Sequence, residues 1–194
     1  RERDRHLPIP SERKAMKLIV SVICFAVSVT GLATPGGEKT PSVQQLLARR
    51  LPGLGHRNWI VVADSAYPYQ TAPGIETITV TDGQLSVVKK VFAALRQSRH
   101  VRPIVYVDSE LKFVPEDRAP GISSYRKSLN QLLVGQKVER MLHEKIIAKL
   151  DEAGKSFRIL LIKTPHTQPY TSVFFQLDCS YWSAESEQAL RKAM

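Results

Sequence analysis

The sequence is poor in cysteine and lacks a glycine-rich phosphate loop. Only Cys24 and Cys179 occur in 194 residues, so the chain has neither a disulfide framework nor the cysteine spacing of a metal site. No stretch carries the Walker pattern or the dinucleotide-binding GxGxxG pattern. These absences exclude a disulfide-stapled scaffold and disfavour a nucleotide-dependent enzyme.

Clustered positive charge is also missing, although the formal net charge is +10. Basic residues are interleaved with acidic ones apart from small groups such as Arg49-Arg50 and Lys89-Lys90. Without residues 1–33, which hold six basic and three acidic residues, the remainder carries 22 minus 15, or +7. Phosphate recognition needs gathered Lys and Arg. We therefore expect no nucleic-acid partner.

No apolar run is long enough for a typical membrane span. Residues 18–29 are uncharged and apolar, Arg13, Lys14 and Lys17 precede them, and small residues follow at 30–33. This pattern is typical of a signal peptide. It predicts an N-terminal extension with signal peptide at 1–33, export to the periplasm or outside, and anchoring if cleavage fails. The alternative is that residues 18–29 form a buried strand or helix.

A Pro- and Gly-rich linker is expected at 34–41, followed by one domain at 42–194. The expected strands lie at 59–63, 75–80, 104–107, 157–162 and 173–177, and the expected helices at 42–51, 85–95, 125–133, 138–150 and 184–194. Near-continuous apolar strands separated by helices indicate a parallel or mixed sheet covered on both faces. The predicted fold class is α/β, a single-domain three-layer α/β/α sandwich.

Two polar segments flank the buried strands, where open α/β sheets bind ligands. In the first, His56 and Asp64 bracket the strand at 59–63. In the second, residues 163–173 form a polar turn between two apolar strands and contain Tyr170 and Ser172. These segments are the first candidates for a site.

The two segments resemble motifs of the ribose pyranase and fucose mutarotase family. Gly55-His56, the following strand, Ala63-Asp64 and Pro68 resemble its first motif. Its Thr-Gly-Glu-x-x-Pro-Tyr-x-Asn-Val signature is matched by Thr164, Pro169, Tyr170 and Val173. Between them, Val138-Glu139-Arg140 resembles the Ile-Glu-Arg entry to a helix in the fucose branch, and Tyr125 falls at a tyrosine of that branch.

The resemblance implies an isomerase that interconverts anomers or ring forms of a free aldose, in homo-oligomers that are often rings with sites near subunit boundaries. Ring opening needs a group that titrates near neutrality, and the resemblance gives this role to His56. Asp64 and Tyr170 complete the implied catalytic set; Arg140, Tyr125, Ser172 and His143 are the implied substrate-binding residues. The partner is a ribose-like or fucose-like monosaccharide. No metal or organic cofactor is expected.

The second motif also departs from the family. Pro165-His166 replaces Gly-Glu, and Ser172 replaces an Asn. A proline restricts the backbone where glycine leaves it free, and a serine loses the paired donor and acceptor of the amide. The alternative function is therefore a sugar-binding or ring-forming protein without turnover.

Each candidate also has a plain structural interpretation. His56 is a solvated loop or capping residue, Asp64 a turn residue and Tyr170 a packing residue; His143 and His166 lie on the surface. Trp59 and Trp182 pack in the core or an interface.

Overall fold

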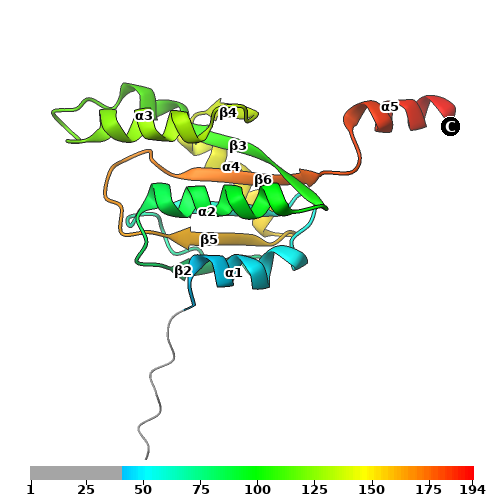
Figure 1. The fold of residues 1–194 in the computed structure, drawn as a ribbon, viewed down its shortest axis with the longest axis horizontal. Coiled ribbons are helices and arrows are strands. Elements are labelled where there is room, and N and C mark those ends of the chain that lie inside the picture. Colours follow the sequence, from blue (N-terminus) through cyan, green and yellow to red (C-terminus); the bar gives the residue numbers. More distant parts are fainter. Residues whose placement is uncertain (1–40) are drawn as a thin grey trace, which may run out of the picture. The chain divides into compact units, whose positions relative to one another are not determined.

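The computed structural model describes residues 41–194, and within them one mixed sheet orders the chain (Figure 1). The predicted signal peptide at 1–33 and the linker, except residue 41, lie outside the described residues. The six strands run in the order β2-β5-β1-β6-β3-β4. Their bounds are β1 Trp59–Ala63, β2 Ile75–Thr79, β3 Val101–Asp108, β4 Val138–Met141, β5 Ile159–Lys163 and β6 Val173–Cys179.

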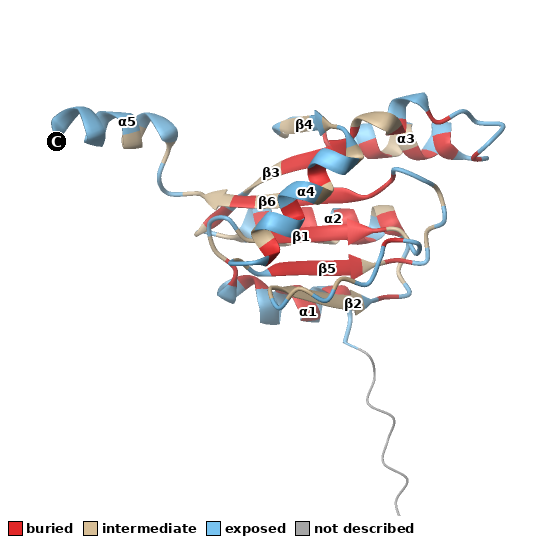
Figure 2. Ribbon diagram, turned by 180° about the vertical axis from the view of Figure 1, so that it is seen from behind, coloured by how far each residue is buried: buried red, intermediate tan, exposed pale blue. Residues whose placement is uncertain are grey.

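Helices cover both faces of this sheet. Their bounds are α1 Val43–Arg50, α2 Gln84–Gln97, α3 Ile122–Leu132, α4 His143–Gly154 and α5 Ala184–Ala193, with short 3-10 turns at Leu51–Gly53 and Ser109–Phe113. The apolar residues of α1, α2 and α3 share one core cluster, and those of α4 belong to the cluster on the opposite face. Figure 1 shows α1 and α2 in front of the sheet, and Figure 2 shows α4 in front from behind. The predicted three-layer sandwich is confirmed.

The central strand β1 shows why the sheet needs both layers. Ile60 and Val62 pack under α1 and α2, whereas Trp59, Val61 and Ala63 pack under α4. All five residues are buried, and Figure 2 colours this strand accordingly. A strand that is apolar on both faces is stable only between two helical layers. The continuous apolar run in the sequence indicated this directly.

The start of the domain follows its local sequence closely. The Ser42 side chain accepts a hydrogen bond from the backbone amide of Gln45, whose side chain bonds back to the amide of Ser42. This capping box satisfies two amides that an unprotected helix end leaves unpaired. The helix expected at 42–51 therefore begins where the sequence provides a cap.

The last helix, α5, buries no residue and stands away from the sheet in both views (Figures 1 and 2). Trp182, just before it, is 44% exposed and its Nε1 donates to Glu187. Trp182 therefore lies outside the core, and its alternative place in an interface stays a prediction, whereas Trp59 is buried as predicted. None of the helices within residues 41–194 is long and apolar enough to span a membrane.

The helix expected at 138–150 begins five residues late. Residues Val138–Met141 form the edge strand β4, which pairs in parallel with β3, and helix α4 starts only at His143. The apolar spacing suited a helix, but the open edge of β3 offered unpaired backbone groups to the first four residues. Tertiary pairing of this kind overrides local propensity.

The strand directions gather several chain segments at one edge of the sheet. Strands β1, β2, β3, β4 and β5 are parallel, and β6 runs antiparallel between β1 and β3. The carboxyl ends of the parallel strands therefore lie beside the amino end of β6. We call the side of the sheet formed by the carboxyl ends of the parallel strands the carboxyl edge, and the opposite side the amino edge. Both names refer to strand ends and not to the edge strands β2 and β4.

Candidate functional site at the carboxyl edge of the sheet

Asp64 and Ser172 meet at the carboxyl edge. Asp64 follows β1 and Ser172 precedes the neighbouring β6, and the Ser172 Oγ donates to Asp64 Oδ2 over 3.2 Å. The other carboxylate oxygen accepts from the backbone amide of Ala66 at 2.9 Å. Asp64 is therefore a turn residue, as its plain interpretation held, and also the centre of a side-chain contact between two strand ends.

His143 lies beside this pair at the first residue of α4. Its Nδ1 is 3.1 Å from Oδ1 of Asp108, the last residue of β3, and its backbone amide donates to both carboxylate oxygens of Glu110, at 3.0 and 3.2 Å. Hydrogen bonding to Asp108 raises the pKa of His143 against an opposing effect of burial. Burial raises the pKa of Asp108, although its bond to His143 opposes the rise.

The surface position predicted for His143 is only half right. Its side chain is 35% exposed, but the Asp108 carboxylate that holds it is fully buried. Sequence reasoning missed Asp108 and Glu110. The signal was available, since both acidic residues follow a predicted strand at the edge where ligands bind, but neither belongs to the motifs that carried the family resemblance.

Tyr170 joins Asp64, Ser172 and His143 in what we call the carboxyl-edge cluster, and it is the member that reaches furthest towards solvent. Its ring stands edge-on to the His143 ring with 5.8 Å between centroids, and the residue is 40% exposed. Its φ is +57°, a left-handed conformation that is uncommon outside glycine. This conformation costs free energy, and it occurs where the loop before β6 places the phenol outside the core.

Tyr125, a predicted substrate-binding residue, holds the loop between β5 and β6 from the side of the core. It is buried in α3, and its hydroxyl donates to the backbone carbonyl of Thr171 at 2.7 Å. The side chain of Gln84 donates to the same carbonyl at 2.6 Å and accepts from the Thr164 hydroxyl at 2.6 Å. Burial raises the pKa of Tyr125. The phenol therefore stays protonated and holds the loop in place.

His166 is not the surface residue predicted. Its ring stacks on Tyr125 at 4.9 Å between centroids, its Nε2 is buried without a hydrogen-bond partner among the described residues, and burial lowers its pKa. The backbone carbonyl of His166 accepts from the Ser65 amide at 2.8 Å. The departure from the family motif at 165–166 therefore gives this loop a stacked aromatic pair.

His56 lies at the amino edge, away from the other predicted catalytic residues. It precedes β1, whose five residues alone span about 16 Å, and Asp64 follows the same strand. Its Nδ1 is 3.8 Å from Oδ1 of Asp178, whose Oδ2 accepts two hydrogen bonds from Arg102 near the start of β3. Within one chain the structure brings Asp64 and Tyr170 to one edge and leaves His56 at the other.

Arg140 lies outside the cluster as well. It belongs to the edge strand β4, where it is in register with Val107, and its guanidinium contacts the Asn130 side chain of α3 at 3.4 Å. This contact turns the cation towards the helical layer. Five predicted residues thus share the carboxyl edge or support it, namely Asp64, Tyr125, His143, Tyr170 and Ser172.

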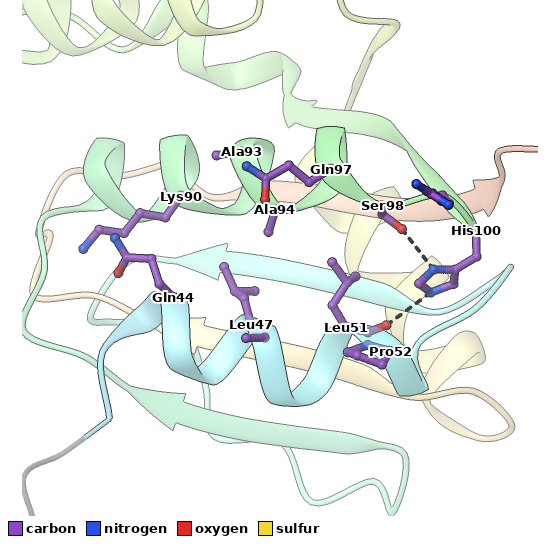
Figure 3. A pocket seen from close by; sticks show the side chains of 12 residues that line it. Gln44, Leu47, Leu51, Pro52, Lys90, Ala93, Ala94, Gln97, Ser98 and His100 are labelled. Carbon is purple, nitrogen blue, oxygen red and sulfur yellow. Dashed lines mark hydrogen bonds between the residues drawn. The ribbon is translucent and has the colours of Figure 1, made fainter.

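Two hollows in the described part of the chain are lined by other residues. A groove of about 550 Å³ runs between α1 and α2, lined by Leu47, Leu51 and Ala94 among others, with His100 at one end bonded to Ser98 and to the Leu51 carbonyl (Figure 3). A second hollow of about 470 Å³ lies at the carboxyl edge over β5 and β2. Neither contains a predicted site residue. Within residues 41–194, no His, Cys, Asp and Glu side chains are grouped as a metal site.

Comparison with known proteins places this fold and these motifs in a family. The model of the RbsD / FucU transport protein family matches residues 38–179. The chain belongs to this family. The match covers all six strands of the RbsD / FucU domain and ends before α5.

The chain is also similar to curated relatives and to solved structures. Two proteins named D-ribose pyranase, from Pseudomonas putida strains GB-1 and KT2440, are 28% and 27% identical over 143 residues, which cover 70% of this chain and 93% of each relative. The structure of Bacillus subtilis RbsD complexed with D-ribose is 24% identical with a TM-score of 0.48, and covers 72% of this chain and 95% of that one. The fucose mutarotase from Streptococcus pneumoniae in complex with L-fucose is 16% identical with a TM-score of 0.46, and covers 72% and 96%.

Proposed function

We propose that this RbsD / FucU family protein binds a free monosaccharide and interconverts its anomers or ring forms. One observation carries the proposal: in a chain of this family, Asp64, Ser172, His143 and Tyr170 converge on the carboxyl edge of the sheet. Their side chains offer carboxylate, hydroxyl, imidazole and phenol groups. Such a set suits a ligand whose surface consists of hydroxyl groups.

The chemistry asks for two proton transfers. The bond between the anomeric carbon and the ring oxygen breaks as that oxygen gains a proton and the anomeric hydroxyl loses one, and the open aldehyde then closes on its other face or onto another hydroxyl. Atoms and charge balance without a redox partner. A group that titrates near neutrality can move both protons. At the carboxyl edge the imidazole of His143 is the group available for this role, next to Tyr170, and Asp64 lies at the same edge to hold hydroxyls.

We further propose that His56 takes part from a second copy of this chain in a homo-oligomer. Its imidazole is 58% exposed at the amino edge, and its own chain places no other predicted catalytic residue there. The carboxyl-edge cluster is open to solvent through His143 and Tyr170. A second copy whose amino edge covers the cluster adds His56, the acid/base group that the family resemblance implies, and excludes water.

The test is anomer exchange of ribose and of fucose, followed by saturation-transfer NMR with and without the protein. We expect acceleration that falls about 100-fold in Asp64→Asn. Asp82→Asn is the matched control, because Asp82 pairs with Lys90 away from the cluster. Exchange at the uncatalysed rate across a panel of aldoses rejects an isomerase.

The second candidate function is sugar binding or ring assembly without turnover. The position of His56 favours it, since a single chain does not hold the implied acid/base beside Asp64. Calorimetry separates the two candidates: sugar binding without accelerated exchange supports the second, and acceleration supports the first.

The export signal predicted at 1–33 makes the periplasm or the exterior the expected compartment. The mass of the mature chain tests whether this signal is cleaved.

A further inference from the structure

His143 is held by two acidic side chains from the segment that ends β3. Asp108 contacts the ring at Nδ1, and Glu110 contacts the backbone amide of the same residue. The first turn of α4 is thereby tied to β3 at two points. Of the two, only Asp108 forms a hydrogen bond with the ring itself.

Asp108 differs from an ordinary surface partner in its burial. The residue is 1% exposed, its Oδ2 is buried without a partner among the described residues, and the histidine is its one side-chain hydrogen bond there. Burying a carboxylate costs free energy unless it is paired. A residue that serves only packing at this place is better apolar, since Val105 and Val107 of the same strand are buried without such a cost.

The contact fixes the state of the imidazole. A carboxylate oxygen only accepts, so in neutral His143 the proton resides on Nδ1, and Nε2 on the far side of the ring keeps its lone pair. In the imidazolium both nitrogens donate. No described residue forms a hydrogen bond with Nε2.

We propose that Asp108 is a positioning residue of the carboxyl-edge site: it holds the His143 ring with Nδ1–H towards β3 and presents Nε2 to a sugar hydroxyl. The role as stated rests on the proposed function, since it assumes a sugar at this edge. The orientation and tautomer are properties of the unliganded protein.

The groups that face His143 are acidic. Asp108 and Glu110 approach from the end of β3, Asp64 contributes its charge from the end of β1, and the Tyr170 ring covers one edge. Each of these carboxylates favours the imidazolium. Removal of Asp108 takes away the strongest of these influences.

The test is an NMR titration of the full-length protein, in which the His143 ring nitrogens are assigned by their loss in His143→Gln. We expect the Nδ1–H tautomer in the parent, and conversion to the Nε2–H tautomer in Asp108→Ala. The pKa of His143 is expected to fall in both Asp108→Ala and Asp108→Asn. Asp82→Asn, which removes a carboxylate that does not contact His143, is expected to leave the tautomer and the pKa of His143 unchanged. An unchanged tautomer and an unchanged pKa in the two Asp108 variants overturn the proposal.

A sugar titration completes the test. If the proposal holds, ribose or fucose shifts the Nε2 resonance of His143 in the parent, and the exchange rate at saturating sugar falls about tenfold or more in Asp108→Ala. If no sugar binds or exchanges in the parent, the proposed function fails, while the tautomer still decides whether Asp108 sets the ring. An Nε2 resonance that is unmoved by a bound sugar overturns the presentation of Nε2.

Discussion

At the scale of single residues, environment separates side chains that look alike in the sequence. His143 and His166 were both expected on the surface, yet one bonds a buried carboxylate and the other stacks on a buried tyrosine. The first contact raises the pKa of His143, and the burial in the second lowers the pKa of His166. The pKa values of two histidines at the same edge of the sheet are therefore shifted in opposite directions.

Opposite pKa shifts predict opposite slopes of stability with pH. Folded His143 binds more protons than the unfolded chain above pH 6.5, so its contribution to the free energy of unfolding is present below pH 6.5 and lost as pH rises through its folded pKa. Folded His166 binds fewer, so stability falls as pH drops below 6.5 towards its folded pKa.

Urea unfolding of the parent, His143→Gln and His166→Gln between pH 5 and 8 measures both slopes as differences from the parent. We expect His143→Gln to differ from the parent in slope above pH 6.5, and His166→Gln to differ below it. Identical slopes in all three proteins contradict the two shifts.

At the scale of elements, the loop between β5 and β6 owes its shape to contacts from two helices. Tyr125 of α3 and Gln84 of α2 both donate to the Thr171 carbonyl. Ser172, next along the chain, then reaches Asp64. The loop is therefore held in place by side chains that are distant in sequence, and its two prolines and its threonines alone do not define its conformation.

Loss of the tyrosine hydroxyl is expected to loosen this loop. Tyr125→Phe leaves the buried carbonyl with one donor fewer, and we expect the free energy of unfolding to fall by about 1 kcal/mol. Hydrogen exchange at Thr171, Ser172 and Val173 is expected to accelerate. Tyr106→Phe is the matched control, because the Tyr106 hydroxyl donates to Gln176 within the sheet. Equal acceleration of loop exchange in both variants argues against a specific role for Tyr125.

At the scale of the whole molecule, the two edges of the sheet carry separate halves of the predicted catalytic set. One strand separates His56 from Asp64, and a strand is too stiff to bring its two ends together. In the homo-oligomer proposed above, these residues meet across the contact between two copies. A contact of one amino edge on the next carboxyl edge is heterologous, and it closes into a ring when the rotation permits.

Complementation between variants tests this arrangement. His56→Ala and Asp64→Asn are each expected to lack accelerated exchange alone. In the proposed homo-oligomer, co-expression in equal amounts is expected to give mixed assemblies in which about a quarter of the interfaces pair an intact His56 with an intact Asp64. Exchange is then expected to recover to about a quarter of the parent rate. Absence of recovery in verified mixed oligomers excludes a site shared between copies, and full activity of His56→Ala excludes a role for that histidine.

The local sequence determined the burial of β1, the start of α1 and the family motifs. The apolar run of β1 indicated a doubly covered strand because every residue in it needs burial, and Ser42 indicated a helix start because its side chain caps nearby amides. The motifs around Asp64 and Tyr170 likewise pointed to the family. These features depend on neighbours within a few residues.

The tertiary structure decided what depends on distant partners. Residues 138–141 became a strand because the edge of β3 was open to them, and Asp108 joined the site because β4 and α4 bring His143 back beside the end of β3. His56 and Asp64 were separated by the length of the strand between them. Sequence spacing specifies which residues share an element, but the order and direction of strands in the sheet determine which residues meet.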